Sequence, residues 1–146
     1  MVAAAPRQRR VLLIEDDAWI RTFLRDVLSD EGYGVVEAAD GRTGLRAATD
    51  DCPDLILLDL AMPEFTGVDV LHGLKRSPRT RSVPVLVLSA FAGVLPDRDA
   101  ASVAGVLTKP IETGKLLAAI RHALEPTQAR QRGALGRPRT RLRIVS

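Results

Sequence analysis

Acidic side chains follow two apolar stretches of this sequence, at the point where each stretch stops. Glu15 and Asp16 come directly after the apolar residues 11–14, and Asp59 directly follows the apolar residues 55–58. If the two stretches are neighbouring strands, the three carboxylates lie close together, and like charges packed together destabilise one another. A divalent cation removes that cost, and Mg²⁺ prefers oxygen ligands and commonly works with phosphates. The sequence therefore predicts an acidic Mg²⁺ pocket.

Two further side chains of complementary chemistry follow later apolar stretches. Ser89 offers a hydroxyl after residues 85–88, and Lys109 offers an ammonium group after the last stretch. With a cation, these groups can neutralise and hydrogen-bond the oxygens of a phosphoryl group. Asp59 can then act as the nucleophile, since carboxylates form acyl phosphates in phosphoryl transfer.

Five short apolar stretches are expected to form the strands that position these groups. Three of them are continuous rather than alternating, which is typical of parallel strands buried on both faces. The second stretch is weaker, and we expect it near an edge of the sheet. Strand–helix alternation five times over predicts a doubly wound α/β fold with right-handed crossovers. The predicted strands are residues 11–14, 34–38, 55–58, 83–88 and 103–107.

Five helices are expected to alternate with these strands. The first has an apolar stripe at spacings of three and four, namely Ile20, Phe23, Leu24, Val27 and Leu28. Asp17 suits its N-cap, and Gly32 suits its end. The last helix has Leu116, Leu117, Ile120 and Leu124 facing inward. The predicted helices are residues 18–30, 41–50, 68–76, a short one within 93–102, and 112–125.

The composition limits the class of protein. The chain has 146 residues, which suits one domain, and its hydrophobic fraction of 46% and charged fraction of 27% are those of a globular protein. No apolar run approaches the roughly 18 residues of a membrane span, and the first ten residues lack the apolar segment of a signal peptide. A single cysteine, Cys52, excludes an intramolecular disulfide. We therefore expect a cytoplasmic protein with no membrane partner.

The net charge of +3 hides an uneven distribution of charge. Nine arginines lie near the two ends, three within the first ten residues and six after residue 126. Without those nine, the other 12 of the 21 basic residues face 18 acidic ones, so the body carries a formal charge of −6. The basic pI therefore describes the ends of the chain rather than its body.

Taken together, these residues resemble the receiver domain of two-component response regulators. Each motif alone is weak, since Asp59 by itself would more often cap a strand, but the set is specific. The resemblance covers residues 10–126, which leaves residues 1–9 as an extension and residues 127–146 as an Arg-rich tail expected to be disordered. The matching motifs are VLLIEDD at 11–17, LILLD at 55–59, Met62-Pro63, Gly67, Ser89-Ala90 and Lys109-Pro110.

The resemblance assigns a role to each acidic residue of the predicted pocket. Asp59 is implied to be the phosphoacceptor. Glu15 and Asp16 match the acid pair that binds Mg²⁺ together with Asp59. The backbone carbonyl of Ala61 is implied as a further metal ligand.

The resemblance also implies the remaining site residues and the topology. Ser89 takes the position of the switch hydroxyl, and Lys109 takes the position of the lysine that contacts the phosphoryl group. A cis peptide is expected before Pro110. The implied fold is flavodoxin-like, with five parallel strands in the order 2-1-3-4-5. That order makes the first and third strands neighbours, as the argument from charge required.

The function implied by the resemblance is that of a single-domain response regulator in a phosphorelay. A sensor histidine kinase or a phosphotransfer protein would donate the phosphoryl group, and the signal would pass to a downstream partner protein. The chain would not be an enzyme beyond catalysing its own phosphorylation and dephosphorylation.

Several residues depart from the usual pattern of the family. Val106 stands where an aromatic residue often lies three positions before the lysine, and the segment 89–109 is shorter than in typical members. Ala61 and Phe91 cannot position an attacking water by hydrogen bonding, so we expect slow self-dephosphorylation with Phe91 shielding the acyl phosphate. Trp19, three residues after Asp16, is expected to report metal binding by its fluorescence.

Two other functions fit parts of the sequence. The first is a receiver-fold module that binds protein or nucleic acid, in which phosphorylation is secondary and the Arg-rich tail contacts phosphates. The tail has no aromatic residues between its arginines and no DNA-binding motif. We therefore interpret it first as a solvated extension and second as a binding arm. The second is a metal-dependent phosphatase with an Asp nucleophile, which would usually have a second acid where Ala61 stands.

Overall fold

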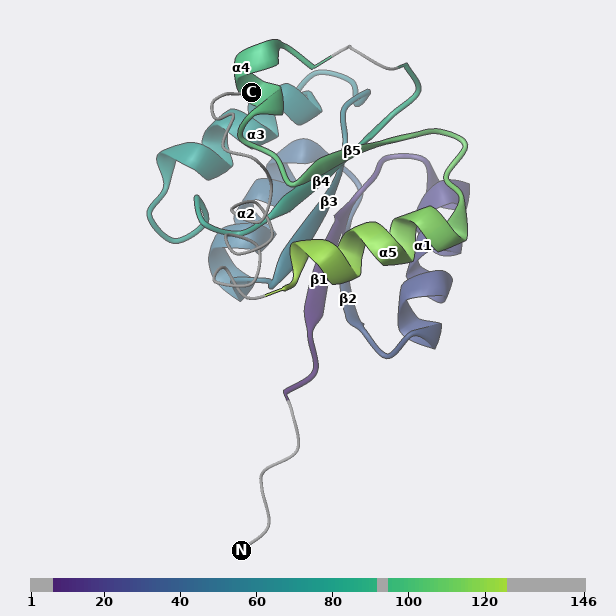
Figure 1. Cartoon of the computed structure of the whole chain (residues 1–146). Helices are drawn as coiled ribbons and strands as arrows, with labels where there is room; N and C mark the ends of the chain where they lie inside the picture. Colours follow the sequence, from purple (N-terminus) through teal and green to yellow (C-terminus); the bar gives the residue numbers. More distant parts are fainter. Residues whose placement is uncertain (1–6, 92–94, 126–146) are drawn as a thin grey trace, which may run out of the picture.

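The computed structural model describes residues 7–91 and 95–125, with a five-stranded parallel sheet between its helices (Figure 1). The strands are β1 (Arg10–Ile14), β2 (Gly34–Ala38), β3 (Leu55–Asp59), β4 (Val85–Ser89) and β5 (Gly105–Thr108). They lie in the order β2-β1-β3-β4-β5, which confirms the doubly wound α/β fold and the order 2-1-3-4-5. β2 forms one edge, as its weaker apolar pattern indicated.

Helices cover both faces of this sheet. They are α1 (Ala18–Asp30), α2 (Gly41–Asp51), α3 (Gly67–Arg76), α4 (Asp97–Ala100) and α5 (Thr113–Ala123). α1 and α5 lie on one face, while α2 and α3 lie on the other (Figure 1). Among the described helices, none combines the length and apolar character needed to cross a membrane.

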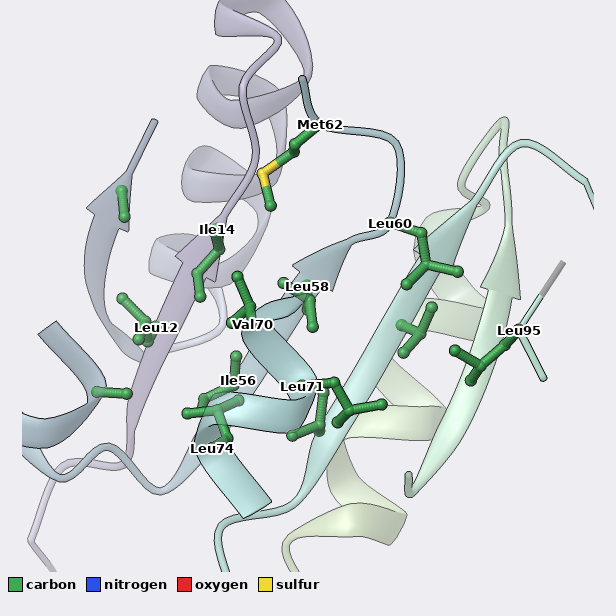
Figure 2. Packing of buried hydrophobic residues seen from close by; sticks show 14 residues of the cluster. Leu12, Ile14, Ile56, Leu58, Leu60, Met62, Val70, Leu71, Leu74 and Leu95 are labelled. Atoms are coloured by element: carbon green, nitrogen blue, oxygen red, sulfur yellow. The ribbon is translucent and has the colours of Figure 1, made fainter. Parts of the chain in front are cut away.

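The apolar cluster beneath α2 and α3 holds the strand ends in place (Figure 2). Alternate residues of a strand point to opposite faces, so one set of side chains from β1 and β3 meets one face of α3. This set comprises Leu12, Ile14, Ile56 and Leu58, and the residues of α3 are Val70, Leu71 and Leu74. Each of these side chains is fully buried, which contributes roughly 1.5–3 kcal/mol apiece relative to exposure. Ile14 and Leu58 directly precede Glu15 and Asp59, so the packing fixes where the acidic residues begin.

Two strands start later than the sequence indicated. β4 begins at Val85 rather than Val83, because the N–H of Val83 donates to the carbonyl of Thr80 in a turn. Pro84 has no N–H to add to the sheet. β5 begins at Gly105 rather than residue 103, since the N–H of Val103 donates to Ala100 in the turn after α4.

Of the two helices after β4, α4 is the short helix expected within residues 93–102, and α5 is shorter than predicted. α4 comprises residues 97–100, inside the expected range 93–102, and it begins directly after Pro96, while residues 93 and 94 lie outside the described residues. A contact of 3.0 Å between His72 Nε2 and a carboxylate oxygen of the buried Asp99 joins this short helix to α3. α5 comprises residues 113–123 rather than 112–125, with Glu112 at its N-cap.

The predicted apolar stripes are partly right. Leu24 and Leu28 of α1 are buried, whereas Phe23 is 46% exposed and does not belong to the core. On α5, Leu116 and Ile120 are buried, but Leu117 and Leu124 are only partly covered. Of the five residues predicted to face the core from α1, only Phe23 lies outside it.

Candidate functional site

The parallel pairing of β1 and β3 brings the three acidic residues together. Ile14 is paired with Leu58, so Glu15 and Asp59 follow at the same end of two adjacent strands. Carboxylate oxygens of Glu15, Asp16 and Asp59 all lie within 4.8 Å of one another. Glu15 and Asp59 are buried, while Asp16 is exposed and closes the cluster on its solvent side.

Lys109 inserts its ammonium group between the two buried carboxylates. Its Nζ lies 3.1 Å from Glu15 Oε1 and 3.2 Å from Asp59 Oδ1. The backbone N–H of Lys109 donates to the carbonyl of Ser89 at 2.7 Å, which ties the end of β5 to the end of β4. The peptide bond between Lys109 and Pro110 is cis, as the resemblance implied.

The charges in this cluster do not balance. Burial, followed by the hydrogen bond and charge of Asp59, raises the pKa of Glu15 to about 7. Burial by itself would lower the pKa of Lys109, but its hydrogen bond to Glu15 and the charges of both carboxylates outweigh burial and raise it. One ammonium group therefore faces three carboxylates, and one of these ionises only reluctantly.

A hard divalent cation suits this donor set. Mg²⁺ binds carboxylate and carbonyl oxygens, and its charge would favour the ionised form of Glu15, which burial and Asp59 disfavour. The carboxylates that would hold it are Glu15, Asp16 and Asp59. Ala61, whose N–H donates to Asp59 Oδ1 at 3.1 Å, follows in the next loop, and the role of its carbonyl as a ligand stays a prediction.

Ser89 lies at the rim of the site but does not contact the carboxylates. Its hydroxyl donates to the carbonyl of Phe91 at 2.8 Å and accepts from the N–H of Phe91 at 3.2 Å. Such a local turn satisfies a serine hydroxyl without any other partner. The predicted position of Ser89 at the end of β4 is right, whereas the orientation of its hydroxyl toward the acidic cluster is not observed.

The loop between Asp59 and α3 is shaped by its backbone. A Cβ on Gly67 would collide with the carbonyl oxygen of Asp59 and with Cα of Leu60, so only glycine fits here. Glu64 has a φ of 64°, in the left-handed region that favours glycine. Thr66 starts α3 with a capping box, in which its hydroxyl accepts from the N–H of Asp69. These features hold the loop against the end of β3.

Asp17 has the predicted structural role. Its carboxylate accepts hydrogen bonds from the N–H groups of Trp19 at 2.9 Å and Ile20 at 3.1 Å, as an N-cap of α1 does. It is therefore engaged with the helix and does not belong to the metal-binding cluster.

An apolar groove beside the site was not predicted. It has a volume of about 300 Å³ and lies between α1 and the segment after β5, with Trp19, Ile20 and Phe23 on one side and Lys109, Pro110 and Ile111 on the other. Trp19 is 88% exposed. The signal in the sequence was the pair of aromatic residues four positions apart, of which Phe23 was assigned to the core.

Comparison with known proteins identifies a family and several relatives that share this sequence. The model of the response regulator receiver domain matches residues 11–121. The DNA-binding dual master transcriptional regulator RpaA of Synechocystis is 38% identical over 121 residues, which are 81% of this chain and 50% of that protein. The transcriptional regulatory protein PdtaR of Mycobacterium tuberculosis is 39% identical over 126 residues, or 84% of this chain and 58% of PdtaR. This chain thus spans about half the length of these relatives.

Solved structures give the same fold. The chemotaxis protein CheY4 of Vibrio cholerae matches with a TM-score of 0.76 and 28% identity, over 81% of this chain and 100% of CheY4. The receiver domain of a sensor histidine kinase from Pseudomonas aeruginosa matches with a TM-score of 0.73 and 26% identity, over 81% of this chain and 98% of that one. That structure contains a magnesium ion in its active-site cleft.

Proposed function

This chain belongs to the family of response regulator receiver domains, and we propose that it accepts a phosphoryl group on Asp59 in a Mg²⁺-dependent phosphorelay. Receiver domains of this family bind Mg²⁺ in an acidic site and interact with histidine kinases or phosphotransfer proteins. The observation that carries the proposal for this chain is the placement of Asp59. Its buried carboxylate ends β3 beside Lys109 and within 4.8 Å of two further acids. The range 10–126 for the domain stays a prediction.

The chemistry proposed for Asp59 is nucleophilic attack on phosphorus. A carboxylate oxygen forms the P–O bond of an acyl phosphate while the P–N bond of a donor phosphohistidine breaks, and the leaving imidazole takes up a proton. Lys109 neutralises one phosphoryl oxygen, and bound Mg²⁺ would supply further charge neutralisation. The hydroxyl of Ser89 reaches a phosphoryl oxygen by turning away from Phe91. The donor is a sensor histidine kinase or a phosphotransfer protein in the cytoplasm.

We propose that the chain catalyses only its own phosphorylation and dephosphorylation, and that the second of these is slow. Ala61 offers a methyl group and Phe91 a ring that is 71% exposed, so neither orients a water molecule toward the phosphoryl group. Phe91→Glu should hydrolyse its acyl phosphate faster than the wild type. Val106→Glu, which adds the same charge at another exposed apolar residue, should leave the rate unchanged. A rapid decay in the wild type that Phe91→Glu does not accelerate contradicts this proposal.

Intact mass measurement tests the phosphoacceptor. The protein is incubated with Mg²⁺ and a small phosphodonor such as acetyl phosphate, and added phosphoryl groups are counted. One group is expected on the wild type and none on Asp59→Asn. Asp50→Asn, which removes an exposed carboxylate at the end of α2, should accept one group like the wild type. An adduct that survives in Asp59→Asn, or no adduct on the wild type, would refute the proposal.

A binding module is the second candidate function. It is favoured by Val106, which is 43% exposed on the edge strand β5, and by the single turn of α4 beside it. Signalling through a downstream protein would use the same surface, so the two candidates differ in whether phosphorylation controls binding. Loss of salt-dependent DNA binding on deletion of residues 127–146, with no effect of phosphorylation, would favour the module.

A further inference from the structure

A polar pocket lies at the end of the sheet opposite the acidic site. It has a volume of about 260 Å³ and is formed where β4 and β5 begin and α3 and α5 end. Because the acidic residues lie at the carboxyl ends of the strands, the two sites are on opposite sides of the sheet's length. The pocket is lined by Lys75, Ser82, Val83, Pro84, Ala101, Ser102, Val103, Ala104, His122 and Ala123, and it is called here the Lys75 pocket.

We propose that the Lys75 pocket binds the phosphate group of an organic phosphate. This goes beyond the proposed phosphorylation of Asp59, since it uses none of the same residues. The argument rests on the cation in the pocket, on the charge of the surrounding segment and on the chemistry of the lining.

Among the described residues, Lys75 is a partly covered cation without a carboxylate partner. Its Nζ donates one hydrogen bond, of 3.2 Å, to the carbonyl oxygen of Arg81, and it makes no ion pair within residues 7–91 and 95–125. An ammonium group has three donors, so two remain for a ligand. Burial lowers the pKa of Lys75, as expected for a charge that lacks a counter-ion. An anion in the pocket would supply that counter-ion.

The segment around Lys75 is positively charged, although the body of the chain carries a net negative charge. Lys75, Arg76, Arg79 and Arg81 follow within seven residues, and the sequence has no acid between Asp69 and Asp97. In the described part of the chain, none of these four cations pairs with a carboxylate.

Arg79 is held away from the pocket by neutral acceptors. Its Nε donates to the carbonyl of Thr49 at 3.2 Å, and one terminal nitrogen lies 3.3 Å from Cys52 Sγ. Arg76 and Arg81 are exposed and directly adjoin Lys75 and Ser82 in sequence. They are placed to strengthen the local positive potential rather than to fill the pocket.

The lining suits a phosphate group attached to an organic residue. Lys75 of α3, the hydroxyl of Ser82 in the loop before β4 and the imidazole of His122 of α5 are polar groups of this lining that can bond phosphate oxygens. Val83 and Pro84 supply an apolar wall for the rest of the ligand. His122 Nδ1 lies 3.0 Å from a Glu125 oxygen, so this nearby acid is engaged with the imidazole. Two sources offer the same chemistry, namely a free nucleotide or the backbone of a nucleic acid.

Amide chemical shifts test the proposal and distinguish the two sources. The full chain is titrated without Mg²⁺, so that the acidic site repels anions, with inorganic phosphate, AMP and a short DNA duplex in turn. Shifts are expected at Lys75, Ser82 and residues 101–104. Shifts with AMP and phosphate indicate a free organic phosphate, whereas shifts with the duplex alone indicate a nucleic acid backbone. No shift at these amides with any probe up to about 10 mM would overturn the proposal.

Variants establish whether Lys75 holds the ligand. Lys75→Met should raise the dissociation constant at least about tenfold, while Lys115→Met, the same change at an exposed lysine elsewhere, should change it by less than about twofold. Ser82→Asp places a carboxylate in the pocket and should abolish the shifts, which provides a second variant if Lys75→Met fails to fold. Both pocket variants should still accept a phosphoryl group. Binding unchanged in Lys75→Met or Ser82→Asp would show that the anion lies elsewhere and would overturn the proposal.

Discussion

Replacing Glu15 by Gln tests whether the acidic cluster destabilises the fold when no cation is bound. Burial and the neighbouring Asp59 raise the pKa of Glu15 to about 7 from its ordinary value of 4.5. A pKa that is higher in the folded state contributes stability below the unfolded value, and this stability is lost as the pH rises through the folded value. The shift corresponds to about 3 kcal/mol, or about 2 kcal/mol after allowing for solvent screening near the exposed Asp16.

The amide of Gln cannot ionise, so the variant should escape this loss. Without Mg²⁺, Glu15→Gln should match the wild type near about pH 4, below the ordinary pKa of Glu15, and exceed its free energy of unfolding by about 2 kcal/mol at about pH 8. Urea unfolding followed by circular dichroism measures both values. Asp50→Asn, at an exposed residue, should change stability by less than about 0.5 kcal/mol at either pH.

Mg²⁺ should reverse the order of the two proteins at high pH. A ligand at a hundredfold excess over its dissociation constant stabilises the folded state by about 2.7 kcal/mol, and the wild type should gain more than Glu15→Gln, which lacks one carboxylate charge of the acidic cluster. If the two proteins show the same dependence on pH, or gain equally from Mg²⁺, then the ionisation of Glu15 does not govern the stability of the site.

Three further outcomes follow from residues near the site. Trp19 emission should change on addition of Mg²⁺ to the wild type and not to Asp59→Asn, and an unchanged emission in both would count against its use as a reporter. Glu64→Gly, which removes a side chain from a left-handed backbone position, should raise the free energy of unfolding by about 1 kcal/mol in urea unfolding; a loss instead would mean that the carboxylate makes a stabilising contact. Gly67→Ala should lower it by about 2–3 kcal/mol because its Cβ would meet backbone atoms of Asp59 and Leu60, and a stable variant that still accepts a phosphoryl group would refute this.

Much of the site was predictable because it depends on where strands end. An apolar run buried on both faces must stop near solvent, and a carboxylate directly after it lies at that boundary, as Glu15 and Asp59 do. Parallel pairing then brings the two together regardless of loop details. The hydroxyl of Ser89 was not predictable in this way, since its direction depends on a rotamer and on a turn with Phe91 that sequence spacing does not encode.

The errors at the other elements have local causes. Residues 83–84 are apolar and were therefore predicted to belong to the strand. The turn at Thr80 and the missing N–H of Pro84 prevent their pairing, so β4 begins at Val85. Phe23 fits the helical stripe by spacing, but the neighbouring groove leaves it half exposed. The spacing of apolar residues along a helix indicates which side chains can face the core, but it does not indicate how far the core extends.

The turn made by Ser89 sets up a competition. A hydroxyl has a single proton to donate, so donation to the carbonyl of Phe91 and donation to a phosphoryl oxygen exclude one another. A protein that binds the exposed ring of Phe91 in its present position would stabilise the hydrogen bond from Ser89 to the carbonyl of Phe91. It would therefore oppose phosphorylation of Asp59. Because such coupling is reciprocal, phosphorylation would weaken the hold of that protein by the same factor. The single hydroxyl proton of Ser89 thus couples phosphorylation of Asp59 to the binding of a protein at Phe91.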